Sequence, residues 1–198
     1  MMVNPPKLHL EYLVEGQTKG IRDYLYIEEE NLFLVATADQ SSVNRLNAKV
    51  TNTKLPWENE GGKFMEVGTV EAWQCDLESS KFIKLWSKGY PQEALCIYFD
   101  KASKKLLVGL DDGVVDLVQV KETTYEDIVC DKIHNSRITG LGYDSLTNVV
   151  FSVSQDKIFR ISHGSSLALV LGVPHKEQLL SMFKDNINKR AFIGNKIG

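Results

Sequence analysis

The chain has 198 residues, a formal net charge of −3, 43% apolar residues and 25% charged residues. These values are ordinary for a globular protein. The basic residues are scattered, so the sequence does not predict a nucleic-acid binder, which needs a basic face, or a basic membrane-surface patch. Such a composition leaves most folds open, and the order of the predicted elements must decide between them.

The cysteines and the apolar stretches indicate the compartment. Cys75, Cys96 and Cys130 are far apart and form no CxxC pair, so no thiolate zinc site is expected. An odd number of cysteines without a regular framework fits a reducing compartment. The N-terminus lacks a signal peptide, and the longest apolar stretch, 167–173, is too short to span a bilayer. We therefore expect a cytoplasmic protein with no direct membrane insertion and no cofactor.

The predicted elements of the first third are strands around one long loop. Residues 8–13 begin with apolar and polar residues in alternation and predict an N-terminal strand. Two apolar runs, 21–27 and 32–36, predict a pair of strands. Residues 48–68 are polar and contain Pro56 and the pair Gly61-Gly62, which predicts an inserted loop. A strand-like run resumes at 69–73, and Trp86 falls in a further strand.

The rest of the chain repeats one pattern. A second unit has predicted strands at 94–99, 105–110, 114–120 and about 126–130. A third has them at 138–144, within 149–156, at 157–162 and at 167–171. A fourth unit starts with 179–185 and 191–194. No stretch shows helical periodicity over enough residues to predict a helix.

The repeat aligns without gaps on Ile27, Asp100, Asp144 and Asp185. These positions are 73, 44 and 41 residues apart, and the last two spacings match the roughly 40–45 residues of a four-stranded propeller blade. The loop at 48–68 accounts for the longer first spacing. The sequence thus predicts an all-β fold: one partial β-propeller domain over 1–198, with about three and a half blades. The strand at 8–13 would close the ring, which removes a sheet edge.

At these positions the chain resembles the WD-repeat family. Histidines stand four residues before two of the first strands, as His134 and His175, and aspartates occupy the predicted turns between second and third strands, as Asp39, Asp112 and Asp156. Trp73 lies where a third strand should end. The resemblance implies a hydrogen-bonded set in the third unit, formed by His134, Asp156 and either Ser152 or Ser154. The family's tryptophan is absent there, with Ile161 near its place.

Within that family, the segments 14–16, 107–113 and 192–195 are most similar to the propeller of WD-repeat and FYVE-domain proteins. This resemblance implies an endosomal membrane adaptor, which would bind a phosphoinositide membrane only if a FYVE zinc module follows Gly198. Seven blades would need on the order of 300 residues. The sequence therefore predicts part of a longer propeller.

The function favoured by the sequence is a non-catalytic WD-repeat scaffold, which binds other proteins of a larger cytosolic or cytoskeletal complex. No HExxH, GxSxG or P-loop motif occurs. Candidate partner contacts are Trp57 in the inserted loop, and Gln92 and Arg137 in loops of one propeller face. Two alternatives stay open: the endosomal adaptor, and a propeller-fold enzyme with acidic or histidine side chains in the central channel.

Overall fold

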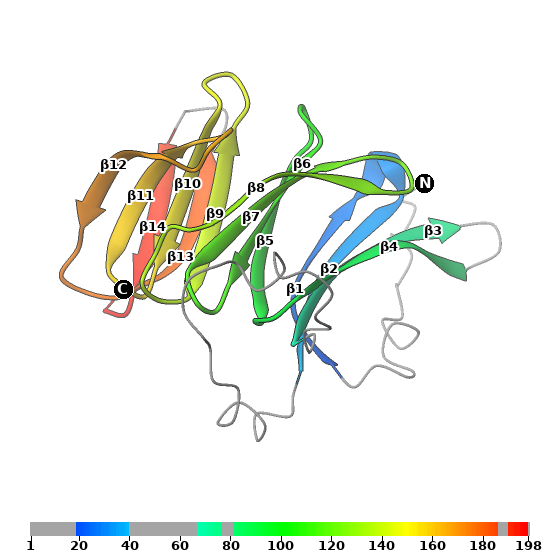
Figure 1. The fold of residues 1–198 in the computed structure, drawn as a ribbon, viewed down its shortest axis with the longest axis horizontal. Helices are drawn as coiled ribbons and strands as arrows, with labels where there is room; N and C mark the ends of the chain where they lie inside the picture. Colours follow the sequence, from blue (N-terminus) through cyan, green and yellow to red (C-terminus); the bar gives the residue numbers. More distant parts are fainter. Residues whose placement is uncertain (1–18, 40–66, 77–80, 186–189, 198) are drawn as a thin grey trace, which may run out of the picture.

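The computed structural model describes residues 19–39, 67–76, 81–185 and 190–197. The predicted strand at 8–13 and nearly all of the predicted loop at 48–68 lie outside these residues, as does Trp57. The described residues form four antiparallel sheets that follow one another in chain order (Figure 1). We call these sheets the first to the fourth blade.

Three blades have four strands and the fourth has two. The first contains β1 (Lys19–Ile27), β2 (Leu32–Asp39), β3 (Gly68–Asp76) and β4 (Lys81–Tyr90), with a 3₁₀ turn, η1 (Glu28–Glu30), between β1 and β2. The second contains β5 (Ala94–Asp100), β6 (Lys105–Leu110), β7 (Val114–Val120) and β8 (Tyr125–Lys132). The third contains β9 (Ile138–Asp144), β10 (Val149–Ser154), β11 (Ile158–His163) and β12 (Leu169–Pro174). The fourth contains β13 (Leu179–Asp185) and β14 (Arg190–Asn195).

The prediction of an all-β, propeller-like fold with about three and a half blades is confirmed. The bounds of β6, β7 and β9 coincide with the predicted strands. The four residues that aligned the repeat, Ile27, Asp100, Asp144 and Asp185, are the last residues of β1, β5, β9 and β13. We call these four strands the inner strands. Each contacts the inner strand of the next blade, so the first strands of neighbouring blades lie side by side.

The hydrophobic core lies in the joints between blades rather than within one blade. Residues of the first and second blades form one cluster, which includes Leu34, Val70, Val108 and Val118. A second cluster joins the second and third blades and includes Leu107, Leu117, Ile138 and Val150. Nearly every residue of β7 is buried, because both faces of its sheet are packed. Such a strand reads as a continuous apolar run rather than as an alternation.

Every inner strand carries a β-bulge at the same repeat position. The strand pairing skips one residue five places before the strand's end in β1, β5, β9 and β13, and the skipped residues are Arg22, Leu95, Thr139 and Leu180. A bulge bends its strand and re-aims a side chain. In this chain the bulge interrupts the alternation of side chains between the two faces of the sheet. It lies near the start of each inner strand, next to the loops of one propeller face.

Candidate functional site

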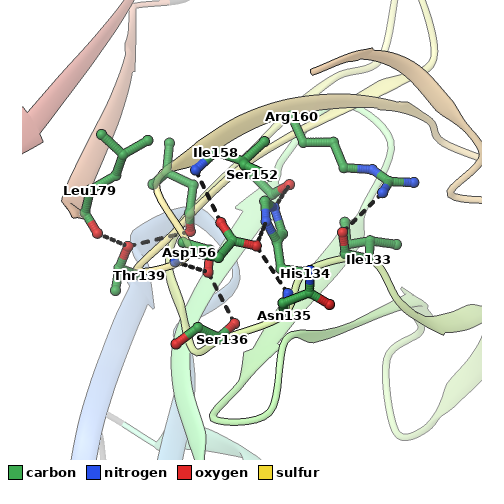
Figure 2. Close-up of polar contacts among 12 residues, drawn as sticks. Ile133, His134, Asn135, Ser136, Thr139, Ser152, Asp156, Ile158, Arg160 and Leu179 are labelled. Carbon is green, nitrogen blue, oxygen red and sulfur yellow. Dashed lines mark hydrogen bonds and ion pairs between the residues drawn. The ribbon is translucent and has the colours of Figure 1, made fainter. Parts of the chain in front are cut away.

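The third blade contains a hydrogen-bonded set around His134, which lies in the connection between β8 and β9. His134 Nε2 is 2.8 Å from Ser152 Oγ on β10, and His134 Nδ1 is 2.9 Å from Asp156 Oδ2 in the turn between β10 and β11 (Figure 2). Asp156 also accepts hydrogen bonds from the backbone N–H groups of Asn135 and Ile158, at 2.9 and 3.0 Å. The set therefore ties the connection that enters the blade to its second strand and its next turn.

The partners of His134 define its tautomer. An ionised carboxylate only accepts hydrogen bonds, so Nδ1 carries the proton toward Asp156, and Nε2 accepts from the Ser152 hydroxyl. Burial lowers the pKa of His134 below its ordinary value, against the opposing effect of Asp156. The imidazole is thus held neutral, and both of its nitrogens are occupied within the blade.

Neighbouring polar groups complete this corner of the third blade. Ser154 donates a hydrogen bond to the Ser136 carbonyl at 3.0 Å and accepts one from the Asp156 N–H. The Arg160 guanidinium donates to the Ile133 carbonyl oxygen at 2.9 Å (Figure 2). It also donates to the Leu167 carbonyl oxygen at 3.1 Å. Carbonyls that end the strand-to-strand connections are thereby satisfied, so this network holds the loops in place.

The second blade uses different residues at the same repeat positions. Tyr90 stands where the third blade has His134, and its hydroxyl donates to Asp116 Oδ2 on β7 at 2.7 Å. Lys88 Nζ lies 2.6 Å from the same oxygen. Burial and the Asp116 charge raise the pKa of Tyr90 well above its ordinary value, so the phenol stays protonated and donates. Sequence reasoning missed this set, because a single Asp in an apolar strand gives no sign of its partner.

Asp112 forms part of a tight turn. Its Oδ1 accepts a hydrogen bond from the Val114 N–H at 3.2 Å. The next residue, Gly113, has φ +92°, and a Cβ there would lie 2.1 Å from the His134 carbonyl oxygen. Only glycine fits this left-handed and crowded position.

The remaining predicted positions are separate from this network. Asp39 is the last residue of β2, opposite Lys19, rather than a turn residue. Trp73 lies within β3, where its indole N–H donates to Glu71 at 3.0 Å and Lys84 Nζ lies 4.8 Å from the ring centroid. His175 follows β12 and is exposed, and its backbone N–H donates to the Lys157 carbonyl.

Two predicted partner contacts, Gln92 and Arg137, lie where the chain enters the inner strands β5 and β9. Arg137 is exposed and its guanidinium is 3.0 Å from Asp111 Oδ1, in the turn after β6. Gln92 is half-buried and precedes Glu93, which pairs with Arg22 at 3.4 Å. We call Gln92, Glu93, Asp111, Arg137 and Gln155 the loop face. Its backbone is rigid, because the Asp111 and Gln155 N–H groups donate to the Glu93 and Arg137 carbonyls.

The described residues also bear on metal binding and on membrane insertion. No group of three or more His, Cys, Asp or Glu side chains there could hold a metal ion. The three cysteines are free thiols. No described helix has both the length and the apolar character needed to cross a bilayer.

No protein-family profile and no curated protein matches the sequence. Solved structures do match. The crystal structure of the RRP9 WD40 repeats has a TM-score of 0.59 at 12% identity, over 91% of this chain and 52% of that one. The fold is that of a WD40-repeat propeller. A chain in the crystal structure of the mitotic checkpoint complex gives a TM-score of 0.64 at 14% identity, over 90% and 47%.

A computationally designed protein, Ika8, also matches, with a TM-score of 0.61 at 19% identity over 92% of this chain and 45% of that one. The present chain therefore spans about half the length of these three solved structures. At such low identity the likeness concerns the WD40-type fold alone. The activity and the partners of the chain must be argued from its own residues.

Proposed function

We propose that the chain is a non-catalytic WD-repeat scaffold that binds other proteins through its loop face, in a cytosolic or cytoskeletal assembly. The observation that carries the proposal is the use of the chain's polar side chains. His134, Ser152 and Asp156 bind one another within the third blade, and Tyr90, Lys88 and Asp116 bind one another between the first and second blades. The groups that could perform chemistry are engaged in holding the blades together.

The loop face supports binding because it contains an exposed charged side chain. Arg137 is exposed, with 45% of its side chain accessible, and its pairing with Asp111 fixes the direction of the guanidinium. Arginine presents several donors in a rigid plane and is enriched at protein interfaces. A charged group held on a rigid loop loses little conformational entropy when a partner binds.

The burial and the hydrogen bonds of His134 argue against the enzyme alternative. A catalytic histidine needs a nitrogen available to substrate, whereas His134 is 3% exposed and both of its nitrogens are hydrogen-bonded. The endosomal alternative depends on a FYVE zinc module. Its support is the resemblance of segments such as 107–113, which here form most of β6 and the following turn.

Proximity labelling or cross-linking in cells, followed by binding of the purified partner, tests the scaffold. Arg137→Glu should weaken the interaction at least tenfold without changing the thermal melting curve. Lys101→Glu is the matched control, since it also reverses an exposed cation paired with the neighbouring blade, but at the other end of the inner strands. If Arg137→Glu binds every recovered partner as tightly as the wild type does, the loop face is not the binding surface.

A further inference from the structure

The outer edges of the three complete blades differ in one respect. Each four-stranded sheet ends in an outer strand, β4, β8 or β12, which pairs with a single neighbour among the described residues. The other side of such a strand presents backbone N–H and C=O groups that can pair with another chain. Soluble proteins protect these edges with charged side chains or bulges. All three outer strands contain a bulge, at Leu85, Ile128 and Val170, so the bulge does not distinguish them.

Charge does distinguish them, at two equivalent positions. The strand pairing shows which positions of the three blades are equivalent. Glu71, Asp116 and Arg160, for example, occupy the same position on the third strands of their blades. At the first outer-strand position, just before the bulge, β4 has a lysine, β8 an aspartate and β12 a leucine: Lys84, Asp127 and Leu169. At the second position the residues are again lysine, aspartate and an aliphatic: Lys88, Asp131 and Val173.

β12 is therefore an edge without charge protection. Its six residues, Leu169–Pro174, include no charged side chain, and all six are exposed. The exposed fractions are 59% for Leu169, 50% for Val170 and Leu171, and 36% for Val173. Pro174 has no N–H to donate, so a ladder on this edge would end at Val173.

We propose that β12 is a self-association edge, which pairs antiparallel with β12 of a second copy of this chain and joins two third blades into one continuous sheet. The occupant follows from the absence of charge. A second β12 places no like charges opposite one another, whereas two copies of β4 or β8 would bring lysines or aspartates together, which destabilises a sheet. The pairing also removes the aliphatic side chains of both copies from water.

A two-fold axis limits the assembly to two copies. Among the outer strands of the three complete blades, β12 is the one without a charged side chain, and antiparallel pairing uses this edge in both copies. An interface that uses the same surface on both subunits closes at a dimer. This inference does not depend on the loop face, because Arg137 precedes β9, at the inner side of the same blade.

The test measures the molar mass of the 198-residue chain by light scattering across a concentration series. We expect the wild type to approach twice the monomer mass of 22.3 kDa as concentration rises. Leu169→Lys, which installs the lysine that β4 carries at this position, should remain monomeric. Leu146→Lys is the matched control, because Leu146 is 87% exposed in the turn between β9 and β10, and this variant should still dimerise.

A wild type that remains monomeric at its highest soluble concentration would overturn the proposal. So would assemblies that keep growing beyond two copies. Loss of the dimer in Phe192→Lys, with Leu169→Lys unaffected, would assign the contact to the exposed face of β14 instead. Amide hydrogen exchange on the wild type decides the matter if a variant fails to fold: the amides of 169–173 must become protected as the dimer forms, and a dimer without that protection contradicts the edge pairing.

Discussion

The hydroxyl of Tyr90, the last residue of the first blade, lies 2.7 Å from Asp116 Oδ2 in the middle strand β7 of the second. This hydrogen bond crosses the joint between two blades. In the third blade the residue at the same repeat position, His134, instead binds Ser152 and Asp156. The repeat therefore conserves the position of a buried polar side chain while it changes both the side chain and its partner.

Tyr90→Phe should destabilise the fold, because it removes one donor from a carboxylate that is fully buried. Asp116 Oδ1 already has no hydrogen-bond partner among the described residues, so the variant would leave the carboxylate with Lys88 alone. Loss of a partner to a buried charged group costs about 1–3 kcal/mol. Urea unfolding measures the change in the free energy of unfolding. Tyr125→Phe is the control: it removes the same atom from a half-buried ring on β8 and should cost less than about 0.5 kcal/mol.

Protonation of His134 should lower the stability of the chain in mild acid. Burial holds the pKa of folded His134 below its ordinary value of 6.5, whereas the unfolded chain takes up the proton near that value. The unfolded state then binds more protons as pH drops below about 6.5, so the free energy of unfolding decreases. Unfolding curves at several pH values between about 7.5 and 5 measure this slope. His134→Gln should reduce this slope, and an unchanged slope in that variant would contradict the account.

Gly113→Ala should be among the most damaging single substitutions in the second blade. The residue has φ +92°, and the added Cβ would meet the His134 carbonyl at 2.1 Å. The positive φ costs about 1–2 kcal/mol for a residue with a side chain, and relief of the clash must move the backbone of the next blade. Gly172→Ala is the matched control, since its Cβ would have 3.8 Å of space on β12. Equal thermal midpoints for the two variants would refute this account.

Arg137→Ala should hardly change stability. The Arg137–Asp111 pair is at the surface, with 45% of the arginine side chain accessible, and exposed ion pairs contribute about 0–1 kcal/mol. Thermal melting should therefore match the wild type within a few degrees. A large loss of stability would mean that Arg137 acts mainly within the fold, and the interpretation of its role in partner binding would have to change.

The propeller-like fold could be predicted because each blade repeats the same apolar spacing. Strands such as β6 and β7 are buried on both faces, so their apolar runs stand out in the sequence. The Tyr90–Asp116 pair could not be predicted in the same way. Asp116 is the one charged residue in a mostly apolar strand, and its burial depends on how two blades meet. Asp39 matched the turn aspartates in spacing, yet it is the last residue of β2 and is paired with Lys19 of β1.

The shared bulge of the inner strands makes each blade an equivalent repeat unit. Because Arg22, Leu95, Thr139 and Leu180 occupy the same place, a complete blade can be duplicated or removed without disturbing how its neighbours begin. Deletion of Thr139 alone would instead straighten β9 and turn the side chains before it to the other face. Changes in length are therefore confined to whole blades and to turns. The inserted loop predicted at 48–68 would be a change of this kind, because it falls between β2 and β3.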